Sequence, residues 1–266
     1  MKITKELLKE KGACADGYRD FLKEYPVDKY PDGVDYQELL DCCAEKNFSY
    51  GSWLLGAFGK ANAVRKIDGD LIVEKGIIFA GWLEVKGCIK AGWGIEAGDG
   101  IEVGDGIEAG GGIKAGWGIE AGGCIKAGYG INAGWGIEAG LGIEAGLGIE
   151  AGWSIKAGCG INAGLGIEAG WGIKASCGIK AGGGIKAGGG INAGNGIKAS
   201  CGINAGLGIE AGWGIEAGDE FGIYAGLRCR ITNKTQRKII AKKRPENIMC
   251  GEFEEKSDSE GKKDGV

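Results

Sequence analysis

One strictly periodic array limits the folds available to this chain more than any other feature. From Ile89 to Gly218 the pattern Ile, Glu/Lys/Asn, Ala, Gly, variable residue, Gly runs through 22 consecutive hexads with few exceptions and no insertion. A fixed period of this kind indicates stacked coils in which each repeat contacts only its neighbours. The array must therefore be interpreted before any local preference for helix or strand.

Glycine makes up 58 of the 266 residues, which by itself would suggest a collagen rod or a disordered chain. Collagen is excluded because glycine does not fall on every third position and the chain has only 3 prolines. Disorder is disfavoured because every hexad carries an apolar residue at fixed positions. The glycines are therefore expected to serve a regular fold.

Within each hexad, isoleucine and alanine stand two residues apart with a charged or amide residue between them. This alternation is typical of a strand whose Ile and Ala face inward and whose middle residue faces water. Glycines on both sides of the variable residue permit corner conformations that other residues resist. Each hexad is thus predicted to be one short strand followed by one corner.

The variable position indicates how many hexads close one coil. Identical non-glycine residues recur there at a spacing of three hexads five times and never at a spacing of two; the recurring sets are Trp117, Trp135, Trp153 and Trp171, Leu147 with Leu165, and Cys159 with Cys177. The spacing favours three hexads per coil over a flat two-sided coil. It predicts a mainly β protein built on a triangular parallel β-solenoid of about 18 residues per coil.

The pattern resembles the hexapeptide-repeat β-helices, whose coils also contain three six-residue faces, over about 150 residues. That family usually places its small residue four positions after the aliphatic one, whereas alanine here follows at plus two. The glycine-punctuated core is also similar to that of bactofilins, the polymer-forming β-helix proteins of bacteria. A general similarity links it to Gly-Ile-Glu-Ala-Gly repeat proteins of phages and prophages.

Three regions are predicted: a helical head over 1–62, the solenoid over 63–231, and a basic strand with an acidic disordered tail over 232–266. In the head we expect helices over Lys5–Lys11 and Ala13–Tyr25, a third introduced by an Asp35/Glu38 capping box, and a fourth capped by Ser49 and ended by Gly59. The head is expected to cover the first open coil, since terminal coils of a solenoid need covering. The alternative is a head that binds a partner or dimerises.

No catalytic residue, metal site or cofactor is predicted. Many hexapeptide β-helices are acyltransferases with a histidine base, and related carbonic anhydrases bind zinc through histidine, but this chain has no histidine. The ten cysteines form no CxxC pair and are typical of reduced, structural thiols. Gly59-Lys60 is followed by Ala61, so the nucleotide-binding GK[ST] motif is also missing.

The tryptophan column is the clearest indication of a partner surface. Because Ile and Ala already fill a narrow prism, the variable residue is expected at a partly exposed corner, where an apolar stripe on a soluble protein usually marks an interface. The predicted interaction residues are Trp117, Trp135, Trp153, Trp171, Leu141, Leu147 and Leu165. A homodimer packed along the rods is the simplest use, and rings that only cover their own corner are the alternative.

Two charged segments are further candidates for a binding surface. A local acidic patch could mimic nucleic acid over part of the rod, and it comprises Glu96, Asp99, Glu102, Asp105 and Glu108. Residues 228–244 carry eight Lys or Arg and no acid, which suffices for nonspecific phosphate binding. Without interleaved aromatics, this segment is interpreted as an exposed edge or a contact for the acidic tail, and nucleic acid is not the expected partner.

Taken together, the residues predict a non-enzymatic protein that acts by protein–protein contact. The resemblance to phage-type repeat proteins implies an inhibitor of a bacterial defence or nucleic-acid-processing complex; the alternative is a self-assembling, bactofilin-like scaffold. The sequence shows no signal peptide and no apolar run long enough to span a membrane. The expected location is therefore the cytoplasm, that of the host if a phage encodes the protein, with no membrane contact.

Overall fold

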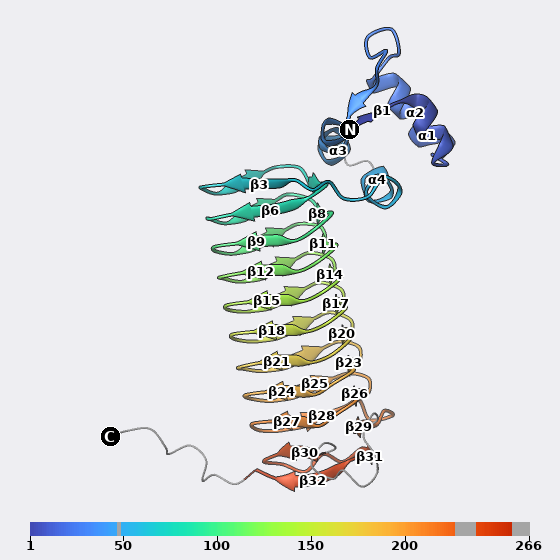
Figure 1. The fold of residues 1–266 in the computed structure, drawn as a ribbon. Coiled ribbons are helices and arrows are strands. Elements are labelled where there is room, and N and C mark those ends of the chain that lie inside the picture. Colours follow the sequence, from blue (N-terminus) through green and yellow to red (C-terminus); the bar gives the residue numbers. More distant parts are fainter. Residues whose placement is uncertain (47–48, 227–237, 257–266) are drawn as a thin grey trace.

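The computed structural model describes residues 1–46, 49–226 and 238–256. It is a parallel β-solenoid with a group of helices beside its N-terminal end (Figure 1). Three sheets run along the rod, and each coil contributes one strand to each of them. The predicted fold class, a mainly β solenoid with a few N-terminal helices, is confirmed.

Each sheet is named here by its first strand. The β4 sheet contains β4 (Leu71–Val73), β7 (Ile89–Ala91), β10 (Ile107–Ala109), β13 (Ile125–Ala127), β16 (Ile143–Ala145), β19 (Ile161–Ala163), β22 (Ile179–Ala181), β25 (Ile197–Ala199) and β28 (Ile215–Glu216). The β5 sheet contains β5 (Ile77–Phe79), β8 (Ile95–Ala97), β11 (Ile113–Ala115), β14 (Ile131–Ala133), β17 (Ile149–Ala151), β20 (Ile167–Ala169), β23 (Ile185–Ala187), β26 (Ile203–Ala205), β29 (Ile223–Ala225) and β31 (Ile248–Cys250). The β3 sheet contains β3 (Val64–Ile67), β6 (Trp82–Val85), β9 (Ile101–Val103), β12 (Ile119–Ala121), β15 (Ile137–Ala139), β18 (Ile155–Ala157), β21 (Ile173–Ala175), β24 (Ile191–Ala193), β27 (Ile209–Ala211), β30 (Lys238–Ala241) and β32 (Glu252–Glu255).

The register confirms a coil of three hexads. Ile107 pairs with Ile125 and Ala109 with Ala127, so each inward residue stacks on its own kind one coil later. The isoleucines of the regular array are at most 3% exposed, and the alanines up to Ala211 are buried beside them. The middle residue of each strand lies on the outer surface, as the alternation predicts. Corner residues therefore form a separate, outward row between neighbouring sheets.

Close approach of successive coils explains the glycine that follows each alanine. A Cβ atom on Gly140 would lie 2.0 Å from the carbonyl oxygen of Gly122 in the coil before it. The glycine that precedes each isoleucine is less constrained, since a Cβ atom on Gly136 would lie 3.4 Å from its nearest neighbour. Packing therefore disfavours a side chain in the first row, which only Ser176 and Ser200 interrupt within the array, whereas the second row has room for Ser154.

The head contains α1 (Lys5–Glu10), α2 (Ala15–Glu24), α3 (Tyr36–Lys46) and α4 (Tyr50–Phe58). Thr4 caps α1 through its hydroxyl, which accepts a hydrogen bond from the Leu7 N–H at 3.3 Å. Ser49 makes no side-chain cap of α4, so that part of the prediction is wrong. Two short antiparallel strands, β1 (Lys2–Ile3) and β2 (Val34–Asp35), were not predicted, because two residues are too few to show alternation.

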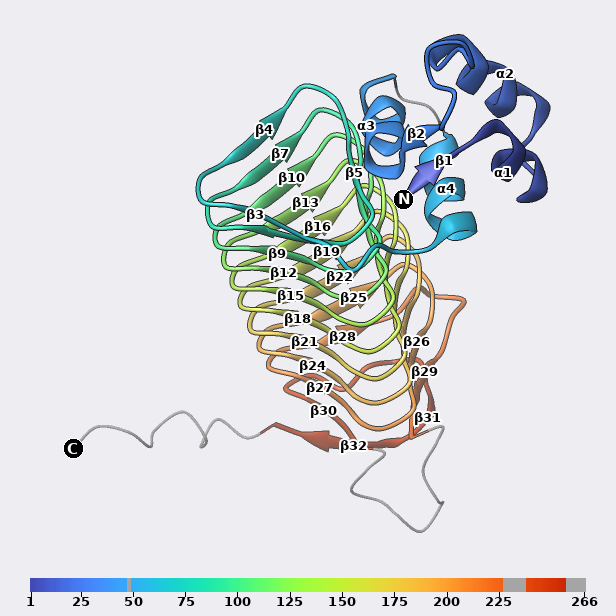
Figure 2. The same ribbon diagram turned by 45° about the horizontal axis from the view of Figure 1, so that its top comes forward.

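The head packs on β5, the first strand of its sheet (Figure 2). The side-chain amide of Gln37 continues the sheet there, donating to the Ile78 carbonyl at 2.7 Å and accepting from the Ala80 N–H at 3.1 Å. The other two first strands are less covered, since the inward residues Ile67 of β3 and Leu71 and Val73 of β4 are only half-buried, whereas Ile77 and Phe79 of β5 are buried. The head therefore covers one of the three sheet ends at this side of the rod.

The C-terminal end continues the rod after the six-residue spacing of the array is interrupted. Ile223 restarts the pattern and pairs with Ile203, and Ile239 then pairs with Ile209. The prediction of a strand through Ile239 and Ile240 is confirmed by β30. Disorder is predicted for the last dozen residues of the tail, most of which lie outside the described residues. Residues 248–255 form β31 and β32, which were not predicted, because pairing with earlier strands offsets their low intrinsic apolar content.

Candidate functional site: the tryptophan corner

The corner between the β5 and β3 sheets carries the four tryptophans of the recurring series, and it is called the tryptophan corner. Backbone hydrogen bonds join these tryptophans from one coil to the next. The Trp135 N–H donates to Trp117 O at 3.0 Å, and the Trp153 N–H donates to Trp135 O at 2.7 Å. The ring centroids are 5.6, 5.7 and 5.5 Å apart, at interplanar angles of 23°, 14° and 9°. The backbone repeat thus stacks the indoles in a single column.

Stacking leaves much of each ring open to solvent. The exposed fractions are 48% for Trp117, 54% for Trp135, 46% for Trp153 and 50% for Trp171. At the N-terminal end, the Lys60 ammonium lies 5.3 Å from the centre of the Trp117 ring and 2.7 Å from Asp99 Oδ1. At the other end the column stops because the next corner residue is Gly189.

The three predicted leucines do not join the tryptophans in one stripe. Leu147 and Leu165 lie at the corner between the β4 and β5 sheets, where Leu165 N–H donates to Leu147 O. Leu141 lies at the third corner, between the β3 and β4 sheets, with Cys159 and Cys177 in the next two coils. These are called the leucine corner and the cysteine corner. Each borders one of the two faces that flank the tryptophans.

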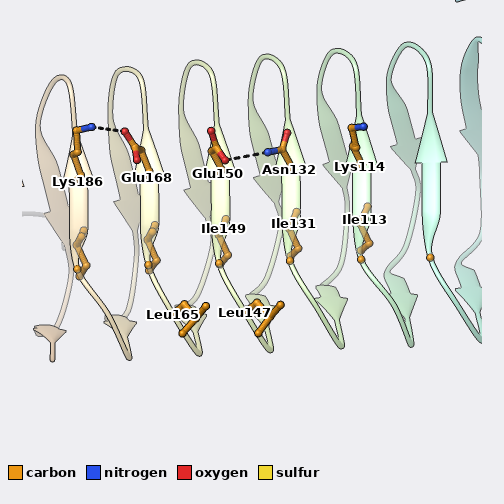
Figure 3. Close-up of a pocket in the computed structure, with 18 of the residues that line it drawn as sticks. Ile113, Lys114, Ile131, Asn132, Leu147, Ile149, Glu150, Leu165, Glu168 and Lys186 are labelled. Atoms are coloured by element: carbon orange, nitrogen blue, oxygen red, sulfur yellow. Dashed lines mark hydrogen bonds and ion pairs between the residues drawn. The ribbon is translucent and has the colours of Figure 1, made fainter. Parts of the chain in front are cut away.

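The outer surface of the β5 sheet, the β5 face, forms a shallow groove of about 1160 Å³ that begins at Ser52 of the head and extends to Tyr224. Its outward side chains pair within the chain, and Lys114 lies 2.9 Å from Glu96. Figure 3 shows two further pairs, Asn132 with Glu150 at 3.1 Å and Lys186 with Glu168 at 2.5 Å. Ser52 of α4 also hydrogen-bonds Glu96. The head thus occupies the N-terminal part of this face.

The outer surface of the β3 sheet, the β3 face, has a different charge order that sequence reasoning missed. Four glutamates stack in successive coils, and two lysines follow them; in chain order they are Glu84, Glu102, Glu120, Glu138, Lys156 and Lys174. A shallow hollow of about 460 Å³ lies beside the glutamates and another of about 440 Å³ beside the lysines. Comparing second positions three hexads apart would have revealed this order.

Pairing on the β3 face is incomplete. Lys66 pairs with Glu84 at 2.5 Å, and Lys156 pairs with Glu138, a hydrogen bond that raises the pKa of the Lys156 ammonium. Within the described part of the chain, Glu102, Glu120 and Lys174 have no ion-pair partner. Like charges directly opposite each other on neighbouring strands are destabilising. The free monomer therefore retains an unfavourable charge arrangement on this face.

The predicted acidic patch is not a patch. Its five residues encircle the rod within about one coil, on two corners and all three faces. Three of them are already paired, Glu96 with Lys114, Asp99 with Lys60 and Glu108 with Lys90. Residues close in sequence here lie on different sides of the rod, and the acids that do gather are those three hexads apart.

Of the predicted basic segment, Arg228, Arg230, Lys234 and Arg237 lie outside the described residues. Lys238 pairs with Glu254, the Lys242 ammonium lies 5.0 Å from the Trp213 ring centre, and the Arg244 guanidinium lies 5.5 Å from that of Phe253. These described cations therefore contact neighbouring coils, in agreement with an edge or tail contact.

The cysteines of the described chain are free thiols. Burial raises the pKa of the Cys159 thiol, and neighbouring Cys177 raises it further. In the head, burial raises the pKa of Cys43 to about 12. Among the described residues no group of three or more His, Cys, Asp or Glu could hold a metal ion, and no helix there is long and apolar enough to cross a membrane.

Comparisons with protein-family models, curated proteins and solved structures found no match to this chain. The geometry of the tryptophan corner and of its two flanking faces is therefore the basis for the proposed contact surface.

Proposed function

We propose that this protein is a protein-binding rod that acts by contact rather than by catalysis, and that the tryptophan corner is its contact surface. The observation that carries the proposal is the column of four stacked indoles, each about half exposed. Rings that served only local packing would bury more of their apolar area by lying flat on the sheet. Here the stacking holds them rigidly, so little side-chain entropy is lost when a partner covers them.

The size of the exposed surface supports this proposal. A tryptophan side chain can bury about 150–250 Å², so half-exposed rings leave about 100 Å² each and about 400 Å² in total. Contiguous apolar patches of this size on soluble proteins are often functional interfaces. Tryptophan is also enriched among the residues whose truncation most weakens protein complexes. A partner that covers the column therefore has a rigid, apolar anchor.

The biological process is proposed from resemblance alone. Similarity to Gly-Ile-Glu-Ala-Gly repeat proteins of phages and prophages favours an inhibitor that binds a bacterial defence or nucleic-acid-processing complex. In that setting the rod would act in the host cytoplasm. The tryptophan corner supplies the contact surface that such an inhibitor needs.

Copurification tests this proposal. Tagged protein should retain a bacterial protein complex from a lysate, and Trp135→Ser with Trp153→Ser should reduce its recovery at least about tenfold, since hot-spot aromatics contribute about 2 kcal/mol or more each. The matched control is Leu147→Ser with Leu165→Ser at the leucine corner, because these side chains are 44% and 55% exposed on the same backbone. Equal recovery with both double variants would remove the tryptophan corner as the contact surface.

A second candidate, the self-assembling scaffold, is favoured by the two ends of the β3 sheet. Its first strand, β3, carries Arg65 and Lys66, whereas its last strand, β32, carries Glu254 and Glu255. A second copy placed end to end would continue the sheet with opposite charges in contact. Electron micrographs should then show open-ended filaments that Arg65→Glu shortens, and discrete particles at all concentrations would contradict the scaffold.

A further inference from the structure

We infer that a second copy of this chain covers the tryptophan corner, with the two rods antiparallel and their β3 faces in contact. The two-fold axis would run across the β3 face midway between the coils of Trp135 and Trp153. This inference rests on the proposed contact surface and names a second copy of the chain as the partner that covers it. A bacterial complex would then bind the dimer, and its recovery would depend on the tryptophans through dimerisation. Three rows of residues support the inference. In each row, an antiparallel copy placed about the same midpoint brings compatible side chains opposite one another.

The first row is the tryptophan column. An antiparallel copy about this midpoint places Trp135 opposite Trp153 of the partner and Trp117 opposite its Trp171. All four rings then meet rings, and none faces Asp99 or Gly189. The column alone would contribute about 400 Å² per copy, half of the roughly 800 Å² that each partner buries in a standard interface.

The second row is the set of charges on the β3 face. The same axis places Glu138 opposite Lys156 and Glu120 opposite Lys174, and it places Glu102 opposite Asn192. Glu120 and Lys174, which have no ion-pair partner within the described part of their own chain, would each gain one.

The third row is the opposite edge of the same face, the cysteine corner. Leu141 would lie opposite Cys159 of the partner, and Cys177 would lie opposite the gap left by Gly123. Large side chains thus meet small ones, and no charged corner residue opposes an apolar one within these coils. Both edges of the β3 face are therefore apolar around a charged centre, as in interfaces with complementary potentials.

Other arrangements are less favourable. A parallel copy with its β3 face opposed would place Glu102, Glu120 and Glu138 against themselves, which concentrates six carboxylates in one hollow. The β5 face, which also borders the tryptophans, is occupied at one end by the head through Gln37 and Ser52. Its charges are already paired within the chain from Glu96 to Lys186.

Charge reversal separates effects on the monomer from effects on the dimer. Glu120→Lys relieves the glutamate stack within one chain but places two lysines opposite each other across the axis, twice per dimer. We expect the dimer dissociation constant to rise at least about tenfold while the monomer's thermal stability does not fall. Lys174→Glu should act in the same way, and Glu144→Lys on the β4 face should leave dimerisation unchanged.

The double variant Glu120→Lys/Lys174→Glu tests the antiparallel arrangement, since only there do residues 120 and 174 of different copies meet. Sedimentation equilibrium of the full chain should show dimer affinity restored to within about threefold of wild type. An unrestored dimer, or a single variant that dimerises normally, would overturn the inference. A monomeric wild type would also overturn it, yet the proposed function would stand if Trp135→Ser/Trp153→Ser still lost a bacterial partner.

Discussion

The β5 face and the β3 face are built from the same hexad on the same backbone, yet their charges are arranged differently. On the β5 face Glu96 pairs with Lys114 and Glu168 with Lys186, and Glu150, which is stacked on Glu168, accepts a hydrogen bond from Asn132. On the β3 face acids and bases are segregated into two blocks. The difference shows that the inward side chains determine the fold, whereas the outward side chains can differ between faces and so determine how copies assemble.

The largest expected effect is a loss of stability that should be equal for the β5 and β3 sheets. Ile149 on β17 faces the core from the β5 sheet, and Ile155 on β18 faces it from the β3 sheet, each 1% exposed or less. Replacing either by alanine should lower the free energy of unfolding by about 2–5 kcal/mol, because it removes buried methyl groups and leaves a cavity. Urea denaturation of the two variants should give the same loss within about 1 kcal/mol. A clear difference would show that the two sheets are not equivalent inside.

A smaller loss of stability is expected at the glycine that ends each strand. A Cβ atom on Gly152 would lie 2.1 Å from Gly134 O, and one on Gly158 would lie 1.9 Å from Gly140 O. Alanine at either position should cost about 1–3 kcal/mol, because the coils must separate slightly. Natural serines at 176 and 200 indicate how, since their N–H to O distances lengthen to 3.2 Å. Gly136→Ala should be nearly neutral in the same denaturation assay.

The smallest effect should distinguish the two faces by its sign. Lys186→Glu on the β5 face removes the pair with Glu168 and adds a carboxylate beside Glu168, which is already stacked on Glu150, so the monomer should lose up to about 1 kcal/mol. Glu120→Lys on the β3 face lies between Glu102 and Glu138, so the monomer should gain a few tenths of a kcal/mol. Both shifts should shrink in concentrated salt, and thermal melts at low protein concentration measure them. Shifts of the same sign would remove the contrast between the faces.

Much of the fold could be predicted from sequence because one physical pattern repeats many times. The alternation of Ile107 and Ala109 recurs in every coil, and the recurrence of Trp117 at Trp135 indicates the coil length. Three less regular hexads, which begin at Leu71, Ile77 and Leu83, precede the array at the same six-residue spacing, and they form β4, β5 and β6. The strands β31 and β32 were not predicted, because their strand structure comes from pairing with earlier coils.

The candidate site was predicted only in part. The stacking of the tryptophans follows from their spacing, but the prediction groups Leu141, Leu147 and Leu165 with them although they lie at two other corners. The predicted acidic patch was wrong because its residues are neighbours in the sequence, whereas side chains on one face of the rod come from successive coils. Glu102 and Glu120 are the acids that gather on one face, and comparing second positions three hexads apart would have revealed it.

Sedimentation velocity of the tryptophan-corner variant tests the central claim most directly. Wild-type protein should sediment as a species of twice the 27.4 kDa chain mass, and Trp135→Ser/Trp153→Ser should sediment as the 27.4 kDa monomer with an unchanged circular dichroism spectrum. Leu147→Ser/Leu165→Ser, at the leucine corner and away from the β3 face, should remain dimeric. A tryptophan variant with the same mass as wild type would show that the rings only pack on one another, and it would contradict the account.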